Sequence, residues 1–299
     1  MGTQRNLNGD AQPEAAAAGG NFYERELGAA ITLARAAGAA ALAHYGRPLH
    51  IVHKSENDDP VTQADHAAND VIVAGLQREF PADGLLSEET LDTVRRLSLS
   101  RVWMVDPLDG TKGFIEGNGD FAVQIGLVED GTPVVGVVYQ PVPDVLHYAA
   151  RGVGAWVARP EAQPERMSVA AETEFRRMRL AASRNHHSPR MSEVMRALGL
   201  REEIRRGSVG IKTGLIAERQ CDLYVHLSPR TKQWDTCAPE AILAEAGGRL
   251  TDLWGEPLRY NTEDVRNLNG VVAANGAAHP LVVARLAPLL AKFGRTRVP

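Results

Sequence analysis

The hydrophobic pattern of residues 22 to 80 predicts two helices. Between residues 22 and 45 apolar side chains recur at helical spacing, and a glycine and a proline follow in the usual stop pattern. Thr62 and Asp65 have the spacing of a capping box, which indicates a second helix that begins there and runs to about Phe80. The polar segment 51–59 is expected to connect the two helices.

Shorter apolar segments predict strands in the rest of the first half. The segment 121–128 alternates and is followed by Glu-Asp-Gly-Thr-Pro, which is a hairpin signal. The strands after it are therefore expected to form an antiparallel meander, whereas residues 90–97 look helical. The expected strands are 85–86, 102–105, 121–128, 134–139, 145–149 and 155–157.

The second half changes to an alternation of strands and helices. Strands are expected at 180–182, 223–226, 249–251 and 271–273, and helices at 189–198, 212–219, 236–246 and 280–292. This alternation is typical of an α/β lobe with a largely buried sheet. The polar, proline-bearing segment 159–165 indicates a boundary, so we expect an α/β protein with a disordered tail (1–21), an α+β N-terminal lobe (22–160) and an α/β C-terminal lobe (161–299).

Net charge and cysteine content indicate which kinds of partner, metal site and compartment are expected. The net charge is −4 and the basic residues are scattered, which argues against a nucleic-acid polymer or an anionic membrane as partner. Cys221 and Cys237 are far apart, so a zinc site or a disulfide framework is not expected, and a reducing cytoplasm is the natural setting. No apolar run has membrane-spanning length, and the first 21 residues do not resemble a signal peptide.

The run from residue 103 to 114 carries the strongest chemical signal. Asp106 and Asp109 stand three residues apart after an apolar strand, and Pro107 and Gly110 force a sharp turn there. Such a turn can direct both carboxylates and the Leu108 carbonyl at one point. Hard oxygen ligands of this kind suit Mg²⁺, with positions left for water and substrate phosphate.

Two other acidic positions have a structural and a chemical interpretation. Glu88 and Glu89 follow a short strand and are either a solvated pair at the start of a helix or carboxylates delivered to the Asp106 turn. Asp235 precedes the predicted helix 236–246, where an N-cap role would explain it fully, although a helix N-terminus also favours phosphate.

Asp65 and Thr111 form a second pair. A threonine hydroxyl can hold an attacking water, and a carboxylate behind it can accept a proton from that hydroxyl. In the first turn of its helix Asp65 is equally placed to compensate the helix dipole.

These motifs resemble a known family. Asp-Pro-Leu-Asp-Gly-Thr at 106–111 resembles the signature of the lithium-sensitive, Mg²⁺-dependent inositol monophosphatase superfamily. The following Lys-Gly-Phe, and Lys-Gln-Trp-Asp-Thr-Cys-Ala-Pro-Glu at 232–240, are similar to its 3′(2′),5′-bisphosphate nucleotidase branch. The resemblance extends from about Ile31 to about Ala274 and implies the layered α/β/α/β/α sandwich of the sugar-phosphatase fold.

The resemblance implies roles for the acidic residues. One Mg²⁺ would be held by Glu88, Asp106 and the Leu108 carbonyl, and a second by Asp106, Asp109 and Asp235, with two or three ions in all. Glu88 would bridge metal and attacking water, Glu89 would lie behind it, and Thr111 with Asp65 would relay the proton.

Substrate contacts are also implied by resemblance. Ser183 and His186 lie in a segment similar to the nucleotide-contacting Thr-Arg-Ser-His-Ser, although His187 leaves the histidine open by one position. Lys212 follows a glycine-rich segment in which Ser208 replaces the usual glycine. Lys54, Gly110 and Thr111 complete the predicted set: Lys54 resembles a basic residue near the same site, and the other two belong to the Asp106 turn.

The implied activity is hydrolysis of adenosine 3′,5′-bisphosphate to AMP and phosphate by a monomer or homodimer. An inositol polyphosphate or inositol monophosphate phosphatase of the same fold is the alternative. A non-catalytic nucleotide or metal sensor is disfavoured because every expected ligand and the Thr111 relay occur together. Structural Ca²⁺ is disfavoured because no Asp-x-Asp-x-Asp-Gly loop is present.

Overall fold

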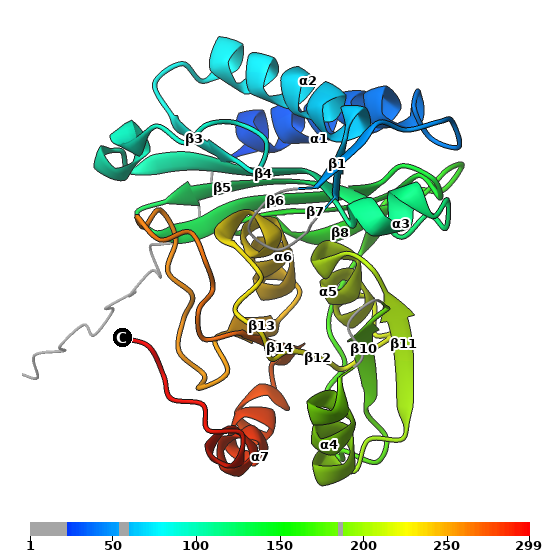
Figure 1. Ribbon diagram of the computed structural model, residues 1–299, viewed down its shortest axis with the longest axis vertical. Helices are drawn as coiled ribbons and strands as arrows, with labels where there is room; N and C mark the ends of the chain where they lie inside the picture. Colours follow the sequence, from blue (N-terminus) through cyan, green and yellow to red (C-terminus); the bar gives the residue numbers. More distant parts are fainter. Residues whose placement is uncertain (1–22, 54–59, 185–187) are drawn as a thin grey trace, which may run out of the picture.

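The computed structural model describes residues 23–53, 60–184 and 188–299. They form five layers: a helical pair, a seven-stranded sheet, a second helical pair, a five-stranded sheet and a third helical pair (Figure 1). The predicted α/β/α/β/α sandwich is confirmed. The predicted tail over 1–21 lies outside the described residues.

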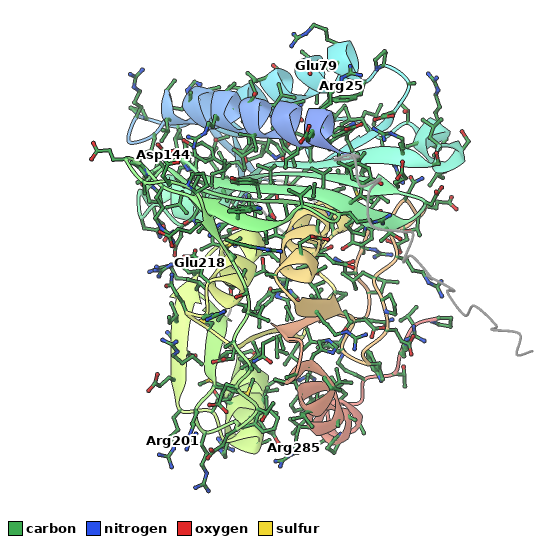
Figure 2. All side chains as sticks on the ribbon, turned by 180° about the vertical axis from the view of Figure 1, so that it is seen from behind. Arg25, Glu79, Asp144, Arg201, Glu218 and Arg285 are labelled. Atoms are coloured by element: carbon green, nitrogen blue, oxygen red, sulfur yellow. The ribbon has the colours of Figure 1, made fainter. Side chains whose placement is uncertain are left out.

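The outermost layer consists of α1 (Glu24–Leu42) and α2 (Gln63–Glu79). The predicted capping box at the start of α2 is present, because the Thr62 side chain accepts from Ala64 N and Asp65 accepts from Thr62 N. Arg25 Nη2 on α1 donates to the Glu79 carbonyl at 2.7 Å and joins the two helices at one end (Figure 2). These helices cover one face of the seven-stranded sheet.

The seven-stranded sheet has the order β3-β4-β5-β6-β7-β8-β9. β3 and β4 are parallel, and the remaining pairs form the predicted antiparallel meander. The strands are β3 (Gly84–Ser87), β4 (Arg101–Asp109), β5 (Ala122–Glu129), β6 (Thr132–Gln140), β7 (Val145–Ala150), β8 (Gly154–Ala158) and β9 (Glu165–Arg166).

The largest difference between a predicted and an observed strand boundary is at the end of β4. β4 does not end at Val105 but continues to Asp109, and its register with β5 shifts between Asp106 and Asp109. Pro107 cannot donate to the ladder, so it is accommodated at this irregularity. The chain turns at Gly110, the residue after the end of β4. Gly110 has φ 98° and directly precedes α3 (Thr111–Ile115).

The five-stranded sheet has the order β11-β10-β12-β14-β13. β10 is parallel to both neighbours, and β14 is antiparallel to both of its neighbours. Its strands are β10 (Arg179–Ser183), β11 (Glu202–Arg206), β12 (Leu223–His226), β13 (Gly248–Thr251) and β14 (Val271–Asn275). The hydrophobic pattern does not predict β11, because this charged edge strand has no apolar alternation.

Two helical layers flank this sheet. α5 (Val209–Ala217) and α6 (Gln233–Glu245) lie between the sheets, and α4 (Pro189–Leu198) and α7 (His279–Lys292) cover the outer face (Figure 1). α5 and α6 each begin three residues before their predicted starts. Asp235 is therefore in the first turn of α6, and Lys232, not Asp235, occupies the N-cap position.

Two short segments also differ from prediction. Residues 90–97 form no α-helix, only the 3-10 turn η1 (Val94–Ser98). In the predicted polar connection, β1 (Ile51–His53) pairs with β2 (Pro60–Thr62) as an antiparallel ribbon. The chain passes between the two large sheets after β9, within residues 167–178, and the division into two lobes stays a prediction.

His279 at the start of α7 predicts an acid-sensitive step in stability. Its Nε2 lies 2.9 Å from Thr251 Oγ1, and burial, followed by the charge of Arg249, lowers its pKa from 6.5 to about 4. The unfolded chain therefore binds a proton at this histidine that the folded chain refuses, so stability falls as pH drops from about 6.5 to 4. In melts with EDTA from pH 7.5 to 4.5, we expect the wild type to lose roughly 3–6 °C more in Tm than His279→Gln. Parallel curves would contradict this assignment.

Candidate active site

Three carboxylates from different elements meet between the sheets. Glu88 follows β3, Asp106 lies in β4, and Asp235 lies in the first turn of α6. Each offers an oxygen within 4.8 Å of the other two. β3 and β4 are parallel with Ser87 opposite Val105, and Glu88 N donates to the Val105 carbonyl at 3.1 Å. The parallel pairing therefore brings Glu88 and Asp106 to the same sheet edge.

The electrostatics of this cluster favour a cation. Asp106 is 2% exposed, and burial, followed by the charges of Glu88 and Asp109, raises its pKa well above the usual range. Burial and the charges of Asp109 and Glu88 do the same to the pKa of Asp235. Three close carboxylates repel one another unless protons or a cation intervene. Hard oxygen donors at this spacing suit a divalent ion such as Mg²⁺.

Asp109 lines the same cavity but makes different contacts. Its Oδ2 accepts from Ser208 Oγ at 2.5 Å, from Val209 N at 2.7 Å and from Gln124 Nε2 at 2.6 Å. The carboxylate therefore caps the N-terminus of α5 from the opposite sheet. Burial raises the pKa of Asp109, and the charge of Lys212 and the hydrogen bonds from Ser208, Gly210 and Val209 oppose that rise. The sequence motif predicts Asp109 but not Gln124, which is a fully buried polar residue in the otherwise apolar β5.

The Asp65 carboxylate both caps the start of α2 and contacts Thr111. Its Oδ2 accepts from Thr62 N and Oγ1, both at 2.8 Å, which completes the cap of α2. Its Oδ1 accepts from Thr111 Oγ1 at 3.0 Å. Burial raises the pKa of Asp65 although the hydrogen bonds from Thr62 and Thr111 oppose it. The cap fixes the carboxylate, and its other oxygen faces the threonine hydroxyl.

The opposite wall of the cavity comes from the five-stranded sheet and α5. Lys212 is 2% exposed, and its Nζ donates to the Gly207 carbonyl at 2.9 Å and lies 4.9 Å from the centroid of the Tyr224 ring. Burial lowers the pKa of Lys212 to about 8, against the charges of nearby aspartates. Ser208 is the N-cap of α5 and accepts from Ile211 N. A buried cation beside a helix N-terminus is suited to binding an anion.

One cavity of about 180 Å³ lies among these residues, and Asp65, Gln124 and Ser208 are not part of its lining. Of the predicted residues, its lining includes Glu88, Asp106, Leu108, Asp109, Gly110, Thr111, Ser183, Lys212 and Asp235. Several other lining residues were not predicted from the sequence, among them Lys112, Tyr224, His226, Arg230, Thr231, Lys232 and Trp234. Lys54 and His186 lie outside the described residues, and so does His187. The additional basic side chains strengthen the case for an anionic substrate.

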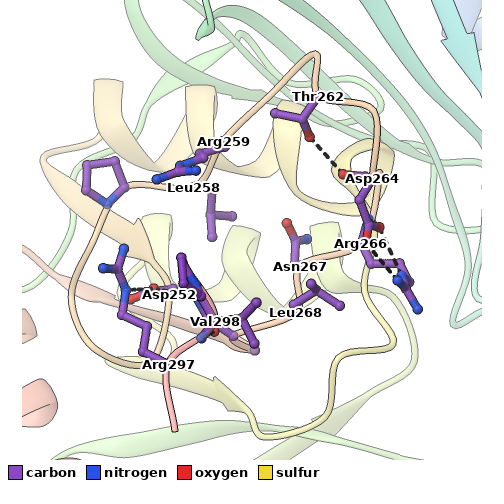
Figure 3. Close-up of a pocket in the computed structure, with 14 residues that line it drawn as sticks. Asp252, Leu258, Arg259, Thr262, Asp264, Arg266, Asn267, Leu268, Arg297 and Val298 are labelled. Carbon is purple, nitrogen blue, oxygen red and sulfur yellow. Dashed lines mark hydrogen bonds and ion pairs between the residues drawn. The ribbon is translucent and has the colours of Figure 1, made fainter. Parts of the chain in front are cut away.

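The loop 257–270 holds the N-terminus of α6 in place. Gln233 N donates to the Val265 carbonyl at 2.9 Å, and Asn267 Nδ2 donates to the Lys232 carbonyl at 3.0 Å. A second cavity of about 200 Å³ lies beside this loop and the C-terminal residues (Figure 3). Its carboxylates are paired, Asp252 with Arg297 and Asp264 with Arg266. In the described part of the chain, the one group of three metal-ligating side chains lies in the first cavity, which is therefore the candidate active site.

Comparison with known proteins identifies relatives over most of the chain. The profile of the inositol monophosphatase family matches residues 23–290. The 3′(2′),5′-bisphosphate nucleotidase CysQ of Escherichia coli K12 is 40% identical over 238 residues, which cover 78% of this chain and 92% of the relative. The histidinol-phosphatase of Mycobacterium tuberculosis is 35% identical over 230 residues, covering 76% and 84%.

Solved structures of inositol monophosphatase family members resemble this chain in fold. CysQ from Bacteroides thetaiotaomicron, described as a bacterial member of the inositol monophosphatase family, has a TM-score of 0.73 and 34% identity, covering 85% of this chain and 98% of that one. The IMPase from Thermotoga maritima has a TM-score of 0.77 and 25% identity, covering 90% and 100%. Within the described residues, none of the helices is long and apolar enough to cross a membrane.

Proposed function

Because this chain belongs to the inositol monophosphatase family, we propose that it is a metal-dependent phosphatase that hydrolyses adenosine 3′,5′-bisphosphate to AMP and phosphate. The observation that carries the proposal is the buried group of Glu88, Asp106 and Asp235, which shares one cavity with Lys212 and the N-terminus of α5. Acidic ligands for a cation and basic groups for a phosphate thus face each other. The nucleotide assignment is supported by the 40% identity to the CysQ nucleotidase.

We assign the ligands of two Mg²⁺ ions from the described residues. Glu88, Asp106 and the Leu108 carbonyl would hold one, and Asp106, Asp109 and Asp235 would hold the other. When bound, the ions would lower the pKa of a water and stabilise the negative charge that develops on the leaving oxygen. The four carboxylates that line the cavity, Glu88, Asp106, Asp109 and Asp235, all belong to these two ligand sets, so the third ion stays a prediction.

The chain itself supplies the proton relay. Thr111 Oγ1 has two acceptors within hydrogen-bond distance, Asp65 Oδ1 at 3.0 Å and the Leu108 carbonyl at 3.2 Å. When its one proton is donated to Asp65, its lone pairs can accept a hydrogen bond from the attacking water. As the water loses its proton to Thr111 Oγ1, the threonine proton passes to Asp65. The raised pKa of Asp65 makes its carboxylate a better acceptor for that proton.

The remaining residues position the substrate. Lys212 on α5 would hold the phosphate that is not cleaved, and Ser208, the N-cap of α5, orients that turn. Ser183 at the end of β10 and Gly110 at the end of β4 line the same cavity. Water attacks phosphorus in line, without a covalent phosphoenzyme, because the site relies on positioning and charge stabilisation. Lys54 and His186 stay predicted substrate contacts.

A phosphate-release screen with Mg²⁺ tests the proposal. Adenosine 3′,5′-bisphosphate is compared with 3′-AMP, inositol 1-phosphate, inositol 1,4-bisphosphate, fructose 1,6-bisphosphate and L-histidinol phosphate. We expect the highest kcat/KM for adenosine 3′,5′-bisphosphate. A higher value for inositol 1,4-bisphosphate would replace the nucleotidase assignment with the inositol polyphosphate one, and no release from any ester would refute the phosphatase.

Lys212→Ala is expected to raise KM for adenosine 3′,5′-bisphosphate by about ten- to a hundred-fold, since a charge-assisted hydrogen bond contributes about 1.5–3 kcal/mol. The lost contact is to the uncleaved phosphate, so it affects ground state and transition state alike and kcat changes little. Activity on 3′-AMP, which lacks that phosphate, should be nearly unchanged. Steady-state kinetics on both substrates measure this, with Lys292→Ala on the exposed side of α7 as the matched control. If both substrates lose activity equally, Lys212 serves the cleaved phosphate or the fold instead.

A further inference from the structure

Asp120 lies between two parts of the site. One is the turn that carries Asp109 and Thr111, and the other is the wall formed by the end of β10 and the start of α5. Asp120 precedes β5, is 6% exposed, and lines neither the active-site cavity nor the carboxylate cluster. Its carbonyl oxygen is closely surrounded by glycines. A Cβ placed on Gly110, Gly113 or Gly207 would lie 2.5, 2.5 or 2.6 Å from that oxygen. Gly110 is the turn after Asp109, Gly113 lies in α3, and Gly207 directly precedes Ser208, so the backbone of Asp120 packs against segments on both sides of the site.

The side chain of Asp120 reaches the five-stranded sheet. Its Oδ2 lies 2.5 Å from Arg184 Nε, and its Oδ1 lies 3.8 Å from Arg206 Nε. These arginines are at the ends of two paired strands, because Arg184 N donates to the Arg206 carbonyl at 3.0 Å and Ser183 is opposite Arg206. One carboxylate from the seven-stranded sheet is therefore bound to the ends of β10 and β11.

The arginines stand next to predicted substrate contacts in the sequence. Arg184 directly follows Ser183, and Arg206 is two residues before Ser208. A shift of either strand end would therefore move Ser183 or the start of α5, and with the latter Lys212. Without a carboxylate between them, the two guanidinium groups would also repel each other.

We infer that Asp120 is a positioning residue that fixes the substrate-binding wall of the site against the turn that carries Asp109 and Thr111. The inference deepens the proposed function and rests on it. Asp120 does not line the active-site cavity, and its carboxylate is bound to Arg184 and Arg206. Its negative charge also acts on Lys212, whose pKa it raises, and Arg184→Gln separates the two effects because it keeps that charge. Losing its charge therefore weakens substrate binding and leaves the chemical step nearly intact.

Asp120→Asn tests the side-chain link alone, because it preserves the size of the residue and the carbonyl that packs on the glycines. Calorimetric titration with AMP, which is the product and keeps the 5′-phosphate, measures binding without turnover. We expect about a tenfold rise in Kd for AMP and in KM for adenosine 3′,5′-bisphosphate, with kcat within about threefold of the wild type. Asp120→Glu, which restores the charge, should recover part of the loss.

The matched control is Asp144→Asn, labelled at the rim of the same sheet in Figure 2. It breaks the Arg35–Asp144 ion pair of 2.6 Å, and at its φ of 49° asparagine is well tolerated. We expect no change in AMP binding. Arg184→Gln should reproduce the Asp120→Asn effect, and the double variant should be little worse than either single variant, because both remove the same link.

Two results would overturn the inference. Asp120→Asn could lower Tm while leaving Kd and KM unchanged, or the Asp120 and Arg184 variants could have fully additive effects. A wild type that neither binds AMP nor hydrolyses adenosine 3′,5′-bisphosphate would contradict the proposed function instead. The same double-mutant cycle is then measured as KM for the ester that the screen identifies, where coupling supports the inference and additivity refutes it.

Discussion

Asp106→Asn is expected to lower kcat/KM by about three orders of magnitude or more while the fold survives. Asp106 is the member of the carboxylate group that we assign to both Mg²⁺ ions, so its loss removes one charged ligand from each. The side chain of asparagine has almost the same volume, and its Oδ1 can still accept from Leu108 N, which donates to Asp106 Oδ1 at 3.0 Å. Phosphate release at saturating Mg²⁺ measures the loss of activity.

The same variant should stabilise the metal-free protein at neutral and alkaline pH. Burial and the neighbouring carboxylates raise the pKa of Asp106, so the folded wild type retains a proton that the unfolded chain has lost. The stabilising contribution is present at low pH and disappears as pH rises through the raised pKa. The amide of asparagine carries no charge, so the variant does not lose stability in this way as pH rises. In EDTA at pH 8 the variant should melt roughly 2–6 °C above the wild type.

Mg²⁺ should reverse that order. The wild type should gain Tm with added Mg²⁺ because the ion binds only the folded state, and the variant should gain little. Asp130→Asn at the tip of the β5–β6 hairpin, where φ is 49°, is the control and should behave like the wild type. Near-normal kcat in Asp106→Asn, or an equal Mg²⁺-induced rise in Tm in both proteins, would defeat the metal assignment.

The second large effect is expected for Thr111→Val. Valine has the shape of threonine but no hydroxyl, so the water loses its hydrogen-bond acceptor and Asp65 its donor. We expect kcat to fall by about 10²- to 10⁴-fold, the range for general acid–base catalysis. KM and the Mg²⁺-induced rise in Tm should change little, because the carboxylate ligands are retained.

Two variants separate the relay from its surroundings. Thr111→Ser keeps the hydroxyl and should retain most of the activity. Thr62→Val removes the Oγ1 contact of 2.8 Å to Asp65 and weakens the cap of α2, so it should lower Tm more than kcat. If Thr111→Val and Thr111→Ser are equally impaired, the hydroxyl is not the catalytic group and the methyl packing is responsible.

Signals that act over a few residues were read correctly from the sequence. The cap of α2 by Thr62 and Asp65 is present as predicted, since a capping box is complete within four residues. The meander from β5 to β8 was predicted because alternation and a hairpin turn are local features. The charged edge strand β11 was missed for the converse reason: its pairing with β10, not its pattern, makes it a strand.

Contacts between distant residues could not be predicted in this way. Asp109 and Ser208 are 99 positions apart, and nothing in either segment indicates that the carboxylate caps α5. From the sequence, Tyr224 was predicted only as part of an apolar strand. In the structure its ring lies against the Lys212 ammonium group, and its hydroxyl has no hydrogen-bond partner among the described residues. The contacts of Gln124 and Asp120 likewise could not be predicted from their own segments of the sequence.

The sequence by itself therefore determined most of the helices and strands and marked the acidic residues of the candidate site, because periodicity, capping and the Asp106–Thr111 motif are each contained in a short segment. The layered fold was implied by the family that these motifs resemble. Only the tertiary structure decided how these parts meet. It brought Glu88, Asp106 and Asp235 within 4.8 Å of one another, turned Asp109 toward α5, and joined the two sheets through Asp120 and its arginines. The physical reason is that these contacts come from packing two sheets against one pair of helices, and that packing places side chains together according to the fold and not according to their distance along the chain.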